Sequence, residues 1–93
     1  MTLQIHLKST IVIPGLEADP VALPGDVLTL RDLLNYIGSK IHFELIDEQS
    51  GSLKEDLEII INDKEIWFYP EGLETPIEGD DTVEIHMVPL GGG

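Results

Sequence analysis

The change of hydrophobic period along the chain is the feature that most limits its fold. Residues 2–8 alternate strictly, with Leu3, Ile5 and Leu7 on one face, which is typical of a half-buried strand. From Leu28 onward the apolar residues recur at helical spacing, and strand-like runs return near residue 57. A single amphipathic helix set among short strands indicates the α+β class.

Residues 28–41 predict the main helix. Its apolar stripe consists of Leu30, Leu33, Leu34 and Ile37, and reaches Ile41 if the helix does. Thr29 precedes the stripe as a candidate N-cap, and Asp32 follows three residues later, where a carboxylate suits the positive end of a helix. We expect the helix to end at Gly38 or soon after it.

The remaining segments predict four more strands. Prolines and glycines between residues 14 and 25 leave room for a short edge strand around Val21 to Leu23. The β-branched and aromatic runs at 57–61 and 65–69, joined by residues 62–64, predict a hairpin. A turn at 78–81 introduces the last strand, which alternates through Met87. Residues 41–56 fit either a helical continuation or a short extended piece.

The order of elements is therefore β-β-α-β-β-β, in a roll whose mixed sheet of four to five strands packs one face on one main helix. If the first and last strands are central neighbours, His6 and His86 share the solvent face opposite the helix. We interpret them as surface imidazoles, with a recognition or pH-sensing role as the alternative.

Size and charge exclude several function classes. The 93 residues make one domain, 1–90, with a glycine tail at 91–93, and so small a core argues against an enzyme with a deep cleft. The 18 acidic residues against 5 basic ones give a formal charge of -13, which disfavours nucleic acid and anionic membranes and favours basic protein surfaces, unless it serves solubility alone.

Composition also bears on location and on metal chemistry. No stretch is long and apolar enough for a spanning helix, and we interpret the chain as cytoplasmic. It has no cysteine, and its three histidines lack ligand spacing. The acidic pairs are Glu17 and Asp19, Glu55 and Asp56, and Asp80 and Asp81; they match no calcium loop, and we interpret them as solvated turn residues.

The last residues, "MVPLGGG", pose a separate question. Three terminal glycines add nothing to a core and are costly to order, so we expect the tail to be disordered when free. A strand without side chains can enter a channel too narrow for any Cβ and present its carboxylate inside. The last strand would anchor that reach, with Pro89 stopping the ladder and Leu90 offering one apolar contact.

Several motifs together carry a resemblance to a known family. The segments "LTLRDLL", "IIINDKEI", "EGDDTVEI" and "VPLGGG", in this order, resemble the ubiquitin-like β-grasp sulfur carriers of the MoaD/ThiS type. The likeness covers essentially the whole chain. Gly92 and Gly93 match the terminal Gly-Gly of the family, and Pro89 matches its proline. Gly91 departs from the pattern, and Val88 stands where many molybdopterin synthase small subunits carry a second proline.

The resemblance implies a carrier and not an enzyme. Its Gly93 carboxylate would be adenylated by a ubiquitin-activating-type enzyme, then converted to a thiocarboxylate that delivers sulfur to an accepting enzyme. The carrier would bind no cofactor itself, because the activating partner would hold ATP and Mg2+. A sulfur donor enzyme would complete the set of partners. The receiving pathway, whether molybdenum or tungsten cofactor, thiamine, tRNA thiolation or cysteine synthesis, stays open.

Two other functions remain as alternatives. The chain could be a ubiquitin-like modifier that is joined through Gly93 to lysines of target proteins. It could also be a non-catalytic interaction module whose glycines are not natural. For the docking surface beside the tail we select Phe68, Met87 and Leu90 as apolar contacts ringed by acids, although each of these residue types is more often core than interface.

Overall fold

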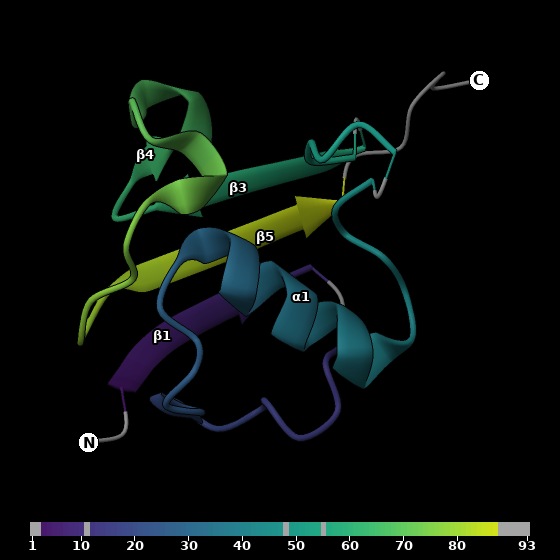
Figure 1. Ribbon diagram of the computed structural model, residues 1–93. Helices are drawn as coiled ribbons and strands as arrows, with labels where there is room; N and C mark the ends of the chain where they lie inside the picture. The colour runs from purple at the N-terminus through teal and green to yellow at the C-terminus, as the bar shows by residue number, and fades with distance from the viewer. Residues whose placement is uncertain (1–2, 11, 48, 55, 88–93) are drawn as a thin grey trace.

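The fold has one helix lying against one face of a five-stranded sheet (Figure 1). The computed structural model describes residues 3–10, 12–47, 49–54 and 56–87. The strands are β1 (Leu3–Ser9), β2 (Val21–Leu23), β3 (Leu57–Ile61), β4 (Lys64–Glu65) and β5 (Thr82–Met87), and the helix is α1 (Leu30–Ile41). The predicted element order is confirmed.

The sheet is mixed because its two central strands run in the same direction. The strand order is β2-β1-β5-β3-β4, with β1 parallel to β5 and the other pairs antiparallel. β2 lies at an edge, as predicted. β5 is the middle strand of the five, so it is held by a neighbour on each side along the register His6↔Thr82 and Leu57↔Met87.

The core lies between α1 and the sheet, and its buried hydrophobic side chains within the described residues are all aliphatic. The predicted stripe of the helix is confirmed, because Leu30, Leu33, Leu34 and Ile37 are each 0% exposed. The inner side of the sheet supplies the alternate residues of each strand, among them Ile5, Val21, Leu23, Leu57, Ile59, Ile61, Val83 and Ile85. Burial of a single Leu or Ile contributes about 1.5–3 kcal/mol, so the strict alternation fixes which face of each strand turns inward.

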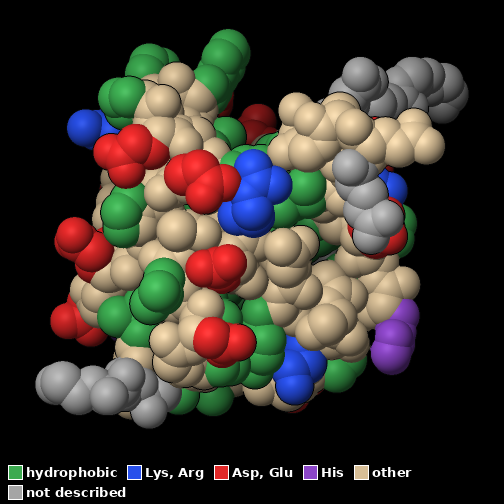
Figure 2. Space-filling model, in the orientation of Figure 1, with side chains coloured by type: hydrophobic (Ala, Val, Ile, Leu, Met, Phe, Trp, Pro, Cys, Tyr) green, Lys and Arg blue, Asp and Glu red, His purple; other side chains and the backbone are tan. Residues whose placement is uncertain are grey.

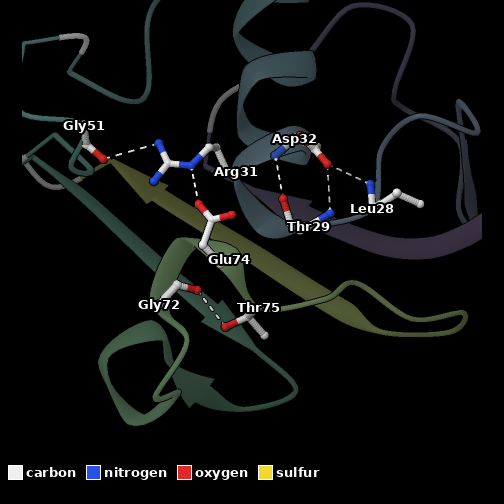
Figure 3. A network of polar contacts seen from close by, with 8 residues as sticks. All are labelled: Leu28, Thr29, Arg31, Asp32, Gly51, Gly72, Glu74 and Thr75. Carbon is white, nitrogen blue, oxygen red and sulfur yellow. Dashed lines mark hydrogen bonds and ion pairs between the residues drawn. The ribbon is translucent and has the colours of Figure 1, made fainter.

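The first turn of α1 is stabilised by a capping box. The Asp32 backbone N–H donates to the Thr29 hydroxyl at 3.2 Å, and the Asp32 carboxylate accepts the N–H groups of Thr29 at 3.2 Å and Leu28 at 3.1 Å (Figure 3). These backbone bonds, first that of Leu28 and then that of Thr29, lower the pKa of Asp32. The predicted N-cap is therefore confirmed.

The other end of α1 lies soon after Gly38, as predicted. The helix continues through Gly38 to Ile41, and His42 ends it in the left-handed conformation, at φ 55. Gly38 serves a different purpose, since a Cβ at this position would meet the backbone oxygen of Phe43 at 2.7 Å. The glycine lets the chain fold back closely over the last turn, and its carbonyl accepts the N–H of Phe43 at 3.1 Å.

The sequence left residues 41–56 open; Ile41 is the last residue of α1, and the described residues of 42–56 form an extended piece and a turn. Leu45 and Ile46 are buried, and Ile46 pairs with Leu53 in an isolated antiparallel bridge. The Gly51 N–H donates to the Asp47 carbonyl at 2.7 Å and closes the turn between them. The segment thus returns the chain from the helix to the start of β3.

The prediction of a second hairpin strand at 65–69 is mostly wrong. β4 has only two residues, and the predicted strand at 65–69 turns into a 3-10 helix, η1 (Ile66–Phe68). The turn before it is as expected, with Asn62 and Asp63 both at positive φ. A second 3-10 helix, η2 (Gly72–Glu74), follows and leads back toward β5.

Candidate functional site

The candidate site is the C-terminal end of β5 and the chain beyond it. β5 lies between β1 and β3, and the Met87 N–H donates to the Thr10 hydroxyl at 3.0 Å. The predicted site residues Pro89, Leu90, Gly91, Gly92 and Gly93 lie outside the described residues. The fold therefore defines the platform from which residues 88–93 continue: the middle strand of the sheet, fixed on both sides.

Met87 lies at the end of that platform and packs against the core. It is half-buried, pairs with Leu57 of β3, and follows Val83 and Ile85 on the inner side of β5. The Met87 side chain therefore makes its contacts mainly within the protein. Of the described candidates, Met87 is the one whose surroundings favour a structural role.

Phe68 lies in a different environment. It belongs to η1 and is 73% exposed, and its neighbour Trp67 is 81% exposed. Their rings are 6.2 Å apart between centroids and inclined at 54°. Met87 packs against the core whereas Phe68 does not, so the structure does not unite these two predicted contacts in one apolar cluster.

Trp67 was missed by the sequence reasoning. The strand predicted at 65–69 would alternate its side chains between two faces and bury one of the two aromatic rings. A usable signal was present, because adjacent Trp and Phe residues cannot both face the core from a strand. Pro70 directly after Tyr69 also limits the length of a strand here.

The face of the sheet opposite α1 is polar and carries both central histidines. Because β1 and β5 are parallel neighbours with His6 opposite Thr82, His6 and His86 share this face, as predicted. His6 contacts the Asp19 carboxylate at 2.7 Å, and His86 contacts the Glu84 carboxylate at 3.3 Å. Each imidazole thus has an acidic neighbour.

Acidic side chains are also frequent on the face that carries α1, where Figure 2 shows them spread over the surface among few Lys and Arg side chains. One of the basic residues, Arg31, is paired within the protein, because its Nε donates to the Glu74 carboxylate at 2.5 Å (Figure 3). That contact links the first turn of α1 to η2, and the Leu30 N–H donates to the Thr75 carbonyl at 2.9 Å beside it. The segment entering β5 is thereby attached to the helix.

Metal sites and membrane spans are two other features to consider in the described part of the chain. Within residues 3–10, 12–47, 49–54 and 56–87, no group of three or more His, Asp or Glu side chains is arranged to hold a metal ion. Over the same residues, no helix has the length and apolar character needed to cross a membrane.

Comparisons with known proteins identify the fold. Neither a protein-family model nor a curated protein sequence matches the chain. Small archaeal modifier protein 1 from Methanosarcina acetivorans is 25% identical, covers 100% of this chain and 99% of its own, and superposes with a TM-score of 0.64. Urm1 from Trypanosoma brucei is 20% identical, with coverage of 98% and 97% and a TM-score of 0.61.

A third solved structure agrees with these two. The HVO 2177 protein from Haloferax volcanii is 18% identical, with coverage of 98% of this chain and 88% of its own and a TM-score of 0.65. The fold is therefore the ubiquitin-like β-grasp, with one helix packed on a mixed five-stranded sheet. The resemblance predicted from the sequence, to β-grasp proteins of the MoaD/ThiS type, is confirmed by neighbours that include Urm1 and the archaeal modifier.

Proposed function

We propose that this chain is a ubiquitin-like sulfur carrier whose reactive group is the carboxylate of Gly93. The observation that supports this most is the place of β5. The strand that precedes the glycines is the middle strand of the sheet, and its end is held by the Met87 bond to Thr10. Six residues beyond Met87 could extend at most about 20 Å, enough to carry a carboxylate from this rigid platform into a partner's active site.

Glycines suit that role because of what they lack. An extended Gly91–Gly93 segment has no Cβ atoms, so a partner can enclose it in a channel that admits backbone only. Glycines have no side chain for a core to bury, so we expect that Gly91–Gly93 can also be changed without unfolding the domain. Folding and reactivity are thus assigned to separate parts of the chain.

The proposed chemistry begins with activation of the carboxylate. A carboxylate oxygen of Gly93 attacks the α-phosphorus of ATP, pyrophosphate leaves, and an acyl adenylate forms. The terminal sulfur of a cysteine persulfide on the donor enzyme then displaces AMP to form an acyl disulfide, and a reducing dithiol cleaves the S–S bond, which leaves a thiocarboxylate on Gly93, the donor cysteine as a thiol and the dithiol as a disulfide. The activating enzyme supplies the ATP and Mg2+ sites, so in this proposal the carrier contributes only the acyl group and the surface that is recognised.

The charge of the domain fits such partners. With a formal charge of -13, the chain would be drawn toward enzymes that surround their entrance with Lys and Arg, and this attraction would weaken with added salt. The proposal therefore includes three kinds of partner: a ubiquitin-activating-type adenylyltransferase, a sulfur donor enzyme and a downstream sulfur-accepting enzyme.

The direct test is to move the carboxylate by one residue. Deleting Gly93, or adding one alanine after it, should abolish ATP-pyrophosphate exchange by the activating enzyme of the same cells. Adding one alanine before Met1 is the matched control and should leave exchange unchanged. Thermal unfolding of all three variants should match that of the unaltered chain. Full exchange with the Gly93-deleted chain would refute the proposal.

A second candidate function is conjugation to proteins. The observation that favours it is the likeness to the Methanosarcina acetivorans protein, which is described as a modifier protein. In that case the activated Gly93 carboxylate would form an isopeptide bond with lysine side chains of targets. Antibody detection of this chain in cell extract would then show a ladder of heavier adducts that disappears when Gly93 is deleted, whereas a pure carrier gives a single band.

A further inference from the structure

The edge of the sheet beside β4 is only partly closed. β3 has five residues, but β4 pairs with just two of them, in the register Ile60↔Glu65 and Ile61↔Lys64. After Glu65 the chain leaves the sheet as η1, so β4 lies alongside only the hairpin end of β3 (Figure 1). Among the described residues, no strand pairs with Leu57, Glu58 or Ile59 on this side, and the Leu57 N–H alone has a backbone partner from a turn, the Lys54 carbonyl at 3.1 Å. An unpaired strand edge of this kind is a template for another strand.

A groove follows the open edge. It has a volume of about 250 Å³. Its lining consists of Leu57, Glu58, Ile59, Glu65, Ile66 and Trp67. One side is thus the open backbone of β3, and the other is the indole ring of η1.

Trp67 is held in place although it is exposed. Its indole N–H donates to the Glu65 carboxylate, and its ring lies beside that of Phe68. A Trp side chain that is 81% exposed leaves a large apolar face in water, which is the composition found at the centre of protein interfaces. Glu58 and Glu65 place two carboxylates in the same groove.

We propose that the open edge of β3 and the Trp67 ring form a docking groove for an extended, lysine- or arginine-bearing segment of a partner protein. The segment adds a strand beside Leu57–Ile59 and gains main-chain hydrogen bonds there. A basic side chain on it lies along the Trp67 ring by its aliphatic stem and pairs its charge with Glu58 or Glu65. The docking proposed for this surface does not depend on the proposed sulfur chemistry.

The negative charge of the chain favours a basic segment in the groove over a second copy of the chain. Two copies would each bring a formal charge of -13 and would place Glu58 and Glu65 opposite the same carboxylates of the partner copy. A basic strand would instead bring positive charges to the carboxylates of Glu58 and Glu65. The groove thus combines an open backbone edge, an aromatic face and acidic side chains, and a basic extended segment satisfies all three.

The experiment uses the full chain and a capped heptapeptide that alternates valine with lysine. Two control peptides share its length: one replaces lysine with glutamate, and one carries N-methyl groups on alternate backbone nitrogens so that it cannot pair as a strand. Trp67 is the one tryptophan of the sequence, so its fluorescence reports on the groove directly. Amide chemical shifts of Leu57–Ile59 report on strand addition.

We expect saturable binding of the Val-Lys peptide, with shifts concentrated at Leu57–Ile59 and at the Trp67 indole. The Trp67→Ala and Glu58→Lys variants should each weaken the affinity about tenfold. Phe43→Ala removes another partly exposed aromatic ring and is the matched control, with unchanged affinity.

Three outcomes would overturn the proposal. Equal affinity for the N-methylated peptide would mean that no strand is added. Equal affinity in the Trp67→Ala and wild-type chains would mean that the peptide binds the acidic surface at large. Concentration-dependent dimers in sedimentation that Glu58→Lys strengthens would assign the groove to a second copy of the chain.

Discussion

Helix α1 and the short helix η1 are both rich in large apolar side chains, yet they place them in opposite ways. In α1, Leu33 and Leu34 are each 0% exposed, whereas in η1 Trp67 is 81% and Phe68 is 73% exposed. The burial of the first pair is explained by the fold itself. The exposure of the second pair means that these rings contribute little to folding, and the proposed docking groove gives one of them, Trp67, a role.

The local geometry of η1 explains the difference. In a 3-10 turn, residues three apart lie on the same side, and here Ile66 and Tyr69 take that side and pack against the core. The Tyr69 hydroxyl donates to the Ile61 carbonyl at 2.6 Å and fixes the turn to β3. Burial, and then the charge of Asp81, raise the pKa of Tyr69, so the neutral phenol that donates this bond is favoured. Trp67 and Phe68 consequently point outward.

The largest expected effect is in the helix. Leu33→Ala should reduce the free energy of unfolding by about 2–5 kcal/mol, because it leaves a cavity in a fully buried position. Leu28→Ala, at a leucine that is 64% exposed, is the control and should change it by less than about 0.5 kcal/mol. Urea denaturation measures both. Similar losses for the two variants would mean that the buried face of α1 is misassigned.

Gly38→Ala should give the next largest effect. Alanine is the better helix former, but its Cβ would lie 2.7 Å from the Phe43 backbone oxygen. The chain after the helix must shift, and we expect a loss of about 1–3 kcal/mol in the free energy of unfolding. Asn35→Ala, at an exposed position of the same helix, should be neutral or stabilising. If Gly38→Ala raised the thermal midpoint instead, the close approach would be disproved.

Asp32→Asn should cost about 0.5–1 kcal/mol at neutral pH, because it removes the charge at the start of α1. The folded pKa of Asp32 is lowered, so its stabilisation is present above the unfolded pKa and is lost as pH falls through the folded pKa. The unfolding free energies of wild type and variant should therefore converge in acid. A constant difference across the acid range would show that the carboxylate charge contributes nothing.

The smallest expected effect, that of Trp67→Ala, is the most informative for the comparison of α1 with η1. Trp67→Ala should change the free energy of unfolding by less than about 0.5 kcal/mol, since the ring is mostly in water. A loss comparable to that of Leu33→Ala would show that the indole supports the fold and would remove the reason to treat η1 as a partner surface. Chemical denaturation followed by circular dichroism is suitable, because the variant lacks tryptophan fluorescence.

The parts of the fold that could be predicted from the sequence are those in which apolar or capping residues recur at a regular spacing. The alternation around Ile5, the stripe through Leu33 and the capping pair Thr29 and Asp32 each depend on spacing that a single chain displays. The need for a glycine at position 38 was not predicted, because it arises from a close approach of Phe43 that exists only after folding. A glycine near a helix end carries the same local signal whether it ends the helix or admits a close neighbour.

The candidate site was predictable to a lesser degree. Phe68 was selected as an exposed contact, and its exposure agrees with that choice, but Trp67 was placed in a strand because β-branched and aromatic residues favour one. What decides against the strand is tertiary: Ile66 and Tyr69 are both needed by the core, and a strand cannot supply both from positions three apart. The role of Gly93 remains a prediction from the resemblance.

The most direct test of the central claim is the intact mass of the protein purified from its own cells, with fragmentation that locates any change. The account predicts a fraction of chains that end at Gly93 and are heavier by the replacement of one carboxylate oxygen with sulfur, the added mass lying on that residue. A natural chain that continues past Gly93 without cleavage would contradict it.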